Sequence, residues 1–163
     1  MPVHPVVARD IMVKRLVTLS PEMDVFKAID TLLKNKISGA PVVDVEGNYL
    51  GIFSERSSIS LLVSAAYEGT PTSTIRPFVD ADAPTVSPET DLLTIAQTFL
   101  STNSRRLPVL DEEGRLAGQV SRRDLLKAAH RLLDLGQTEG SSVLYLSGLS
   151  DPSESSILVL SRV

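Results

Sequence analysis

Ser121 and Asp124, two polar residues three positions apart, open a predicted helix in the second half of the chain. A carboxylate at such a position can accept two hydrogen bonds from the vicinal hydroxyls of a ribose. The free amides and the dipole at the start of the helix attract anions such as phosphate. Residues 105–131 contain seven Lys or Arg against four Asp or Glu, although the net charge of the chain is −4. This segment therefore has the residue types of a site for an anionic ligand that contains ribose.

The same residues have a second interpretation that needs no ligand. A serine followed three positions later by an acid resembles the helix capping box, in which both side chains satisfy free helix amides. The neighbouring Arg122 and Arg123 can lie on the solvated surface, as paired arginines usually do. Residue type and spacing leave the ligand site and the helix cap as alternatives.

Composition disfavours several classes of function. The 163 residues include no cysteine and only two histidines, His4 and His130, so thiolate metal sites and a cysteine nucleophile are excluded and a zinc hydrolase is disfavoured. No apolar run approaches the roughly 18 residues that cross a bilayer, and the N-terminus does not resemble a secretory signal. The acidic net charge disfavours nucleic-acid binding. We expect a soluble cytoplasmic protein that is not an enzyme.

The chain contains two copies of one unit, 67 residues apart. Between Arg9 and Gly69, 17 of 61 residues are identical to the residue 67 positions later, and the alignment needs no gap. The identities fall where geometry restricts residue type, at helix caps, turn glycines and strand-opening prolines. Because half the chain alone would bury little apolar surface, we expect the two copies to share a core.

Each copy is predicted to form a β-α-β-β-α unit. Caps, periodic apolar residues and an acidic glycine turn between two short apolar runs mark its elements. In the first and second copies these are strands at Val17–Leu19 and Thr85–Val86, helices capped by Ser20 and Ser87, strands at Pro41–Val43 and Pro108–Leu110, strands at Tyr49–Phe53 and Leu116–Val120, and helices that begin at Ser54 and Ser121 and end before Gly69 and Gly136.

In combination these elements resemble the cystathionine-β-synthase (CBS) domain, present here as a tandem pair. The motif from Gly118 to Asp124 and the short helix expected at Arg9–Met12 are typical of that family. The resemblance implies an α/β (α+β) fold in which repeats at residues 7–69 and 75–136, joined by a linker at 70–74, pack around a pseudo-twofold axis. It also implies a homodimer.

The family resemblance further implies two clefts between the repeats, which bind AMP, ADP, ATP or S-adenosylmethionine as regulatory ligands. By position, Asp124 would bind the ribose, the arginines would neutralise phosphate, and adenine would rest against Ile37 and the backbone of Ala40. The full set assigned to one cleft is Thr18, Ser20, Ile37, Ser38, Ala40, Arg105, Arg106, Gln119, Ser121 and Asp124. No catalytic residue or metal ligand is assigned.

The other cleft differs because Ser57 stands where the second copy has Asp124. Without a carboxylate we expect that cleft to be empty or to bind much more weakly, since one charge-assisted hydrogen bond contributes about 1.5 to 3 kcal/mol.

The C-terminal extension, residues 137–163, has no counterpart in the first copy. Its two apolar runs, Val143–Leu146 and Ile157–Leu160, flank a polar loop and predict a β-hairpin. Free apolar edges favour aggregation, so we expect this hairpin to pack on the module or across a dimer interface.

Two hypotheses of function remain open. The first is a regulatory module that senses an adenine nucleotide and acts on a separate partner protein. The second is a module without a ligand, whose paired repeats only dimerise or dock a partner. Sequence alone identifies neither the preferred nucleotide nor the regulated protein.

Overall fold

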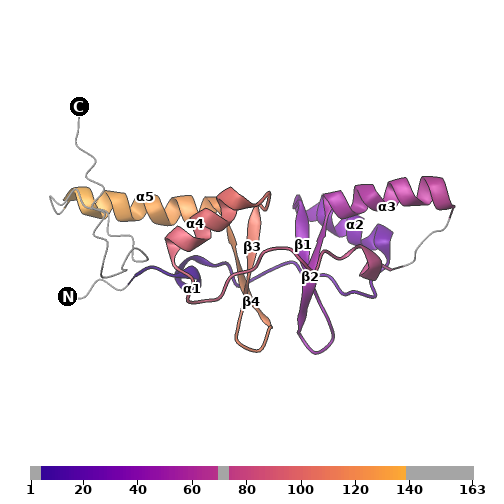
Figure 1. Cartoon of the computed structure of the whole chain (residues 1–163), viewed down its shortest axis with the longest axis horizontal. Coiled ribbons are helices and arrows are strands. Elements are labelled where there is room, and N and C mark those ends of the chain that lie inside the picture. The colour runs from indigo at the N-terminus through magenta and orange to yellow at the C-terminus, as the bar shows by residue number, and fades with distance from the viewer. Residues whose placement is uncertain (1–4, 70–73, 139–163) are drawn as a thin grey trace. The chain divides into compact units, whose positions relative to one another are not determined.

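The computed structural model describes residues 5–69 and 74–138, which form two compact units (Figure 1). The first-repeat unit comprises the described residues of 15–83 together with 110–117. The second-repeat unit comprises 5–14, 84–109 and 118–138. The predicted hairpin in the C-terminal extension lies outside the described residues, as does the predicted linker except for Thr74.

The first-repeat unit packs two helices against a two-stranded antiparallel sheet. Its elements are α2 (Val25–Asn35), β1 (Gly39–Val43), β2 (Tyr49–Ser54), α3 (Glu55–Glu68) and the short 3-10 helix η1 (Arg76–Phe78). A β-bulge between Val42 and Val43 interrupts the pairing of β1 with β2. The buried core of this unit consists of Leu19, Val25, Ala28, Leu32, Ala40, Val42, Phe53, Leu61 and Ile75.

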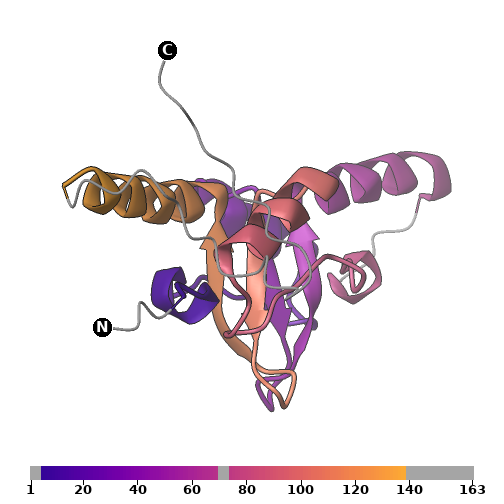
Figure 2. The same ribbon diagram turned by 60° about the vertical axis from the view of Figure 1, so that its left-hand side comes forward.

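The second-repeat unit repeats this arrangement. Its elements are α1 (Ala8–Ile11), α4 (Leu92–Ser101), β3 (Arg106–Leu110), β4 (Leu116–Ser121) and α5 (Arg122–Thr138), and β3 pairs with β4. The hairpin ends of these two strands, Leu110 and Leu116–Ala117, are the exception, because they belong to the first-repeat unit. Ile95, Leu107, Val109 and Val120 are fully buried. The predicted short N-terminal helix is confirmed as α1, which lies beside α5 (Figure 2).

Both predicted hairpins are confirmed, including the turns that connect their strands. Asp44 accepts hydrogen bonds from the backbone amides of Glu46 and Asn48, both at 2.9 Å. Asp111 accepts the equivalent bonds from Glu113 and Arg115 at 3.0 and 2.9 Å. Each turn has a glycine with positive φ, which favours glycine because it has no Cβ.

The prediction that Ser20 and Ser87 cap helices was wrong. The N-cap of α2 is Asp24, which accepts hydrogen bonds from the amides of Phe26 and Lys27, and the N-cap of α4 is Asp91. The Ser-Pro-Glu segments form turns before these helices. An aspartate directly before the apolar run reaches the free amides of the first turn, whereas a serine four residues earlier does not.

The predicted ends of the long helices and the predicted first strands are confirmed only in part. The predicted end of a helix at Gly69 is confirmed, because this residue is a left-handed C-cap with φ of 65°. At the equivalent Gly136 the prediction was wrong, since α5 continues to Thr138. The predicted first strand of each copy is reduced to a single parallel bridge, Leu19 with Val42 and Val86 with Val109.

The aspartate cap of α4 gives a stability prediction. Burial alone would raise the pKa of Asp91, but hydrogen bonds from the amide and hydroxyl of Thr94 lower it below the ordinary value. We expect Asp91→Ala to lower the free energy of unfolding by about 1 kcal/mol at neutral pH. Because the folded-state pKa is depressed, this contribution is present above the unfolded pKa and is lost as pH falls through the folded one. Denaturant titrations of both proteins at neutral and acidic pH measure it; a difference that grows on acidification would contradict it.

The N-terminal segment of each predicted repeat completes the sheet of the other repeat. Val13, near the start of the repeat predicted at 7–69, exchanges two backbone hydrogen bonds with Gln119 of β4 at 2.9 and 3.0 Å. Asp80, 67 residues later, exchanges the equivalent bonds with Ile52 of β2 at 3.0 and 2.8 Å. The sheet of each repeat therefore depends on a segment that belongs to the other repeat in the sequence.

A duplicated ion pair reinforces this exchange. Arg9 pairs with Glu89 in the second-repeat unit, and Arg76 pairs with Glu22 in the first-repeat unit. The Nε atom of Arg76 lies 2.8 Å from the carboxylate of Glu22. Both arginines and both glutamates are related by the 67-residue shift. The side chains are exposed, so each pair contributes at most about 1 kcal/mol and mainly selects the correct partner.

Candidate functional site

Ser121 and Asp124 form a complete capping box at the start of α5. The carboxylate oxygen Oδ2 of Asp124 accepts hydrogen bonds from the amide of Ser121 at 2.9 Å and from its hydroxyl at 2.6 Å. The Ser121 hydroxyl oxygen in turn accepts from the amide of Asp124 at 3.2 Å. The helix-cap interpretation of this motif is therefore confirmed, because the two residues cap α5.

The capping box leaves some of the hydrogen-bond acceptor positions of the Asp124 carboxylate unused. Both bonds that it accepts end on Oδ2, and within residues 5–69 and 74–138 no donor reaches Oδ1. An ionised carboxylate offers about four acceptor positions, of which two are used. Because Ser121 fixes its orientation, Asp124 presents a partly buried, preorganised acceptor.

Arg105 and Arg106 lie close to the start of α5. The carbonyl of Arg105 accepts a hydrogen bond from the amide of Arg122, the first residue of α5, at 3.3 Å. Arg106 opens β3, whose partner β4 carries Gln119 and ends at Ser121. Both arginine side chains are exposed, while the side chain of Gln119 is buried.

The second-repeat unit thus holds five of the ten predicted site residues: Arg105, Arg106, Gln119, Ser121 and Asp124. Two guanidinium groups and the positive end of the α5 helix dipole make this segment attractive to a phosphate group.

The remaining five predicted residues belong to the first-repeat unit. Thr18 and Ser20 flank Leu19, which forms the parallel bridge to β1. The amide of Ile37 donates to the carbonyl of Leu32, which closes the end of α2. The last members of the set are Ser38, whose carbonyl accepts from the amide of Glu55 at 2.9 Å, and Ala40, which is buried in β1.

The equivalent helix start in the first repeat carries no carboxylate at the ligand position. Ser54 caps α3 and accepts a hydrogen bond from the amide of Ser57 at 3.2 Å. The hydroxyls of these two serines lie 3.3 Å apart. Ser57 therefore adds a neutral hydroxyl where the second repeat has the charge of Asp124.

A family model for the CBS domain matches the chain twice, at residues 8–57 and 75–131. The chain belongs to the CBS domain family. The predicted resemblance to a tandem CBS pair is thereby confirmed, and both matched segments contain a helix, a hairpin and the start of the following helix.

Several curated proteins with CBS domains resemble this chain. Protein MJ1225 of Methanocaldococcus jannaschii is 32% identical over 119 residues, which cover 73% of this chain and 41% of that protein. The human 5'-AMP-activated protein kinase subunit gamma-3 is 30% identical over 166 residues, which cover 92% of this chain and 34% of the subunit. The chain spans 23 to 41% of the length of the first four curated relatives that it matches.

Solved CBS-pair structures share the fold. CBSX2 in complex with AMP is 27% identical, with a TM-score of 0.68, over 77% of this chain and 96% of CBSX2. A second structure of CBSX2, from Arabidopsis thaliana, is 25% identical, with a TM-score of 0.71, over 80% of this chain and 99% of that one. The mixed α/β fold of a CBS pair is therefore confirmed.

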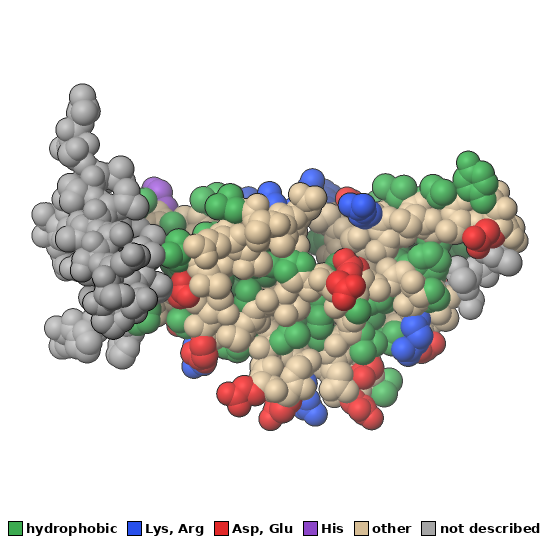
Figure 3. Space-filling view, in the orientation of Figure 1, with side chains coloured by type: hydrophobic (Ala, Val, Ile, Leu, Met, Phe, Trp, Pro, Cys, Tyr) green, Lys and Arg blue, Asp and Glu red, His purple; other side chains and the backbone are tan. Residues whose placement is uncertain are grey.

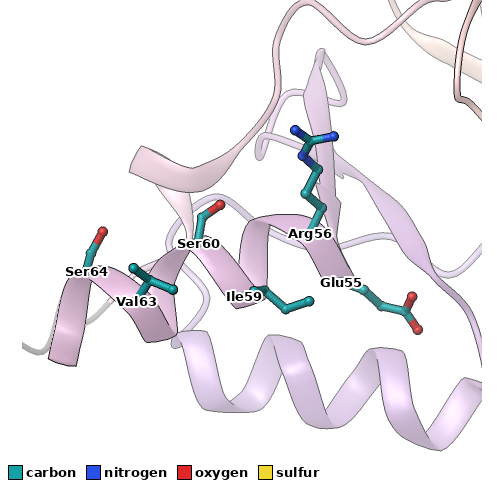
Figure 4. Close-up of a pocket in the computed structure, with 6 residues that line it drawn as sticks. All are labelled: Glu55, Arg56, Ile59, Ser60, Val63 and Ser64. Atoms are coloured by element: carbon teal, nitrogen blue, oxygen red, sulfur yellow. The ribbon is translucent and has the colours of Figure 1, made fainter.

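A shallow depression lies along one face of α3 (Figure 4). All of the residues that line it come from this one helix: Glu55, Arg56, Ile59, Ser60, Val63 and Ser64. A single helix supplies no opposite wall, so the depression is a poor site for a small ligand.

Residues 5–69 and 74–138 contain no cluster of three or more histidine, aspartate or glutamate side chains that could hold a metal ion. None of the helices in the same residues is both long and apolar enough to span a bilayer.

Sequence reasoning missed two features that the structure makes evident. The first is the exchange of the segments around Val13 and Asp80, for which the shared register of Arg9 and Arg76 was the available signal. The second is the side chain of Arg122, which was treated as solvated surface but donates to the carbonyl of Ser104. Neither contact follows from local spacing.

Proposed function

We propose that this CBS pair is a regulatory module that binds an adenine nucleotide and transmits its binding state to a partner protein. The observation that carries the proposal is the carboxylate of Asp124, which Ser121 holds in place while Oδ1 accepts no bond from the described residues. The likeness to CBSX2, a structure in complex with AMP, supports an adenosine-containing ligand. The likeness to a kinase gamma subunit named for AMP supports a regulatory role and not a catalytic one.

Each part of the nucleotide has a proposed partner. Asp124 accepts hydrogen bonds from the ribose hydroxyls, which are charge-assisted and therefore stronger than neutral ones. Arg105 and Arg106 bind the phosphate, which the positive end of the α5 helix dipole also attracts. The residues that contact the rest of the ligand remain a prediction from the sequence. They are Gln119 of the same unit and Thr18, Ser20, Ile37, Ser38 and Ala40 of the first-repeat unit.

Isothermal titration with AMP, ADP, ATP, NADH and S-adenosylmethionine tests this function. Saturable binding of at least one of these ligands is the expected result. The order of their affinities identifies the preferred number of phosphates. Heats equal to those of dilution for all five ligands would contradict the proposal.

The second candidate is an assembly module without a ligand. It is favoured by the observation that capping alone accounts for the three hydrogen bonds between Ser121 and Asp124. In this alternative the repeats serve only to dimerise or to dock a protein. Failure of all five titrations, with a dimer in solution, would select it.

Both candidates include a homodimer, which the outer face of α3 supports. Ile59, Leu62, Val63 and Tyr67 follow one another at helical spacing and are 52 to 87% exposed. Figure 3 shows hydrophobic side chains along this edge of the first-repeat unit. A contiguous exposed apolar stripe of this kind is typical of an interface between proteins.

We expect Val63→Lys to raise the dissociation constant of the dimer by about 100-fold or more, because an unpaired buried charge costs about 3 kcal/mol. Analytical ultracentrifugation over a concentration series measures this constant. Glu68→Lys, on the same helix outside the stripe, is the matched control and should leave the dimer intact. A dimer constant unchanged by Val63→Lys would exclude this face from the interface.

A further inference from the structure

Arg122 connects the start of α5 to the loop that precedes β3. Its Nε atom donates a hydrogen bond to the carbonyl of Ser104 at 3.0 Å. Its guanidinium carbon lies 5.9 Å from the centre of the Phe99 ring, within the range of a cation–π contact. Its backbone amide donates to the carbonyl of Arg105. One residue therefore holds two consecutive carbonyls of this loop.

The other end of the loop is tied to α4. The hydroxyl of Thr102 donates to the carbonyl of Thr98 at 2.8 Å, and the amide of Ser104 donates to the hydroxyl of Thr102 at 3.4 Å. Because Arg122 holds the carbonyl side of Ser104, the backbone from which the Arg105 side chain extends is fixed from both directions.

The first repeat provides an internal comparison. There the backbone bond is retained, from the amide of Glu55 to the carbonyl of Ser38. The side-chain contacts are not, because glutamate replaces Arg122 and Leu32 replaces Phe99. An ionised carboxylate cannot donate to a carbonyl, and leucine offers no aromatic face. The copy that lacks these contacts also lacks the arginine pair, with Ser38 and Gly39 in its place.

We propose that Arg122 is a positioning residue, which holds the Ser104–Arg105 backbone so that Arg105 and Arg106 are preorganised to receive the phosphate of the nucleotide. This inference rests on the proposed nucleotide-binding function. Arg122 itself is engaged by Ser104 and Phe99 and acts through its neighbours. A loop that is already ordered loses less conformational freedom when ligand binds, which raises affinity.

The test compares the affinities for AMP and adenosine by titration calorimetry. We expect Arg122→Gln to weaken AMP binding by about 5- to 10-fold and to leave adenosine binding within about 2-fold, because adenosine has no phosphate. Phe99→Leu keeps the charge of Arg122, removes its aromatic partner and introduces the residue of the first repeat. It should weaken AMP binding by about 3-fold, again without changing adenosine binding.

Arg123→Gln is the matched control for charge. It removes the same positive charge one residue later, and in the described part of the chain no hydrogen bond or ion pair of the Arg123 side chain is found. We expect its AMP affinity to stay within about 2-fold of the wild type. Circular dichroism melts of all the variants establish that each one is folded at the titration temperature.

Four results would overturn the inference. Equal losses in Arg122→Gln and Arg123→Gln would show that only charge matters, and equal losses for AMP and adenosine would show a general structural role. Wild-type AMP affinity in Arg122→Gln, with binding lost in Asp124→Ala, would overturn the positioning role alone. Absence of AMP and adenosine binding in the wild type would overturn the nucleotide-binding function and this inference together.

Discussion

Replacement of Asp124 by alanine is expected to weaken AMP binding by about 100-fold or more. The variant removes the acceptor for both ribose hydroxyls, and each charge-assisted hydrogen bond contributes about 1.5 to 3 kcal/mol. A loss of about 2.7 kcal/mol corresponds to a factor of 100 in the dissociation constant. Calorimetric titration of both proteins with AMP measures the difference.

The alanine variant also removes half of the capping box, so its stability requires a control. Loss of the bonds to Ser121 should lower the free energy of unfolding by about 1 kcal/mol, which leaves the protein folded. Ser57→Ala, at the equivalent position of the first repeat, is the matched variant and should retain the wild-type affinity. Equal AMP affinity in wild type and Asp124→Ala would reject this site.

The second large effect is expected for Gly51→Ala, which should lower the free energy of unfolding by about 3 kcal/mol. Gly51 has φ of 146°, a region that residues with a side chain rarely adopt. A Cβ atom added there would lie 2.7 Å from the carbonyl carbon of Asp80 and 2.8 Å from a methyl carbon of Val79. Relief of this clash would break the hydrogen bonds between Asp80 and Ile52, because the obstructing atom belongs to the backbone.

Two other glycines supply the controls for Gly51→Ala. Gly47 has φ of 85° but open space around its Cα, so Gly47→Ala should cost about 1 kcal/mol. A Cβ atom added at Gly118, 67 positions after Gly51, would lie 2.7 Å from the flexible Met12 side chain and 3.0 Å from the carbonyl oxygen of Val13. Gly118→Ala should therefore cost less free energy of unfolding than Gly51→Ala. Chemical denaturation ranks the three variants. A Gly51→Ala protein as stable as Gly47→Ala would contradict the close packing of the exchanged segment.

Features that depend on local sequence were predictable. The 67-residue repeat, the paired hairpins and the C-cap at Gly69 follow from residues whose types restrict their own backbone. The Ser121–Asp124 pair was also predictable, because capping and ligand binding require the same two residue types at the same spacing. The structure shows that the cap leaves room for the ligand interpretation, since both bonds from Ser121 use a single carboxylate oxygen.

Features that depend on segments distant in the sequence were not predictable. The ion pair of Glu22 with Arg76, 54 residues away, is one such feature, because the local sequence around neither residue identifies its partner. The need for glycine at position 51 is a second, because it arises from the close approach of the Asp80 backbone. A periodicity contains no information about which distant strand completes a sheet.

A crystal structure of the protein with AMP tests the central claim most directly. The account predicts one nucleotide in the second-repeat site, with its ribose hydroxyls about 2.6 to 3.2 Å from the carboxylate of Asp124 and its phosphate beside Arg105 or Arg106. AMP bound with its ribose at Ser57 and the Asp124 carboxylate unengaged would contradict it.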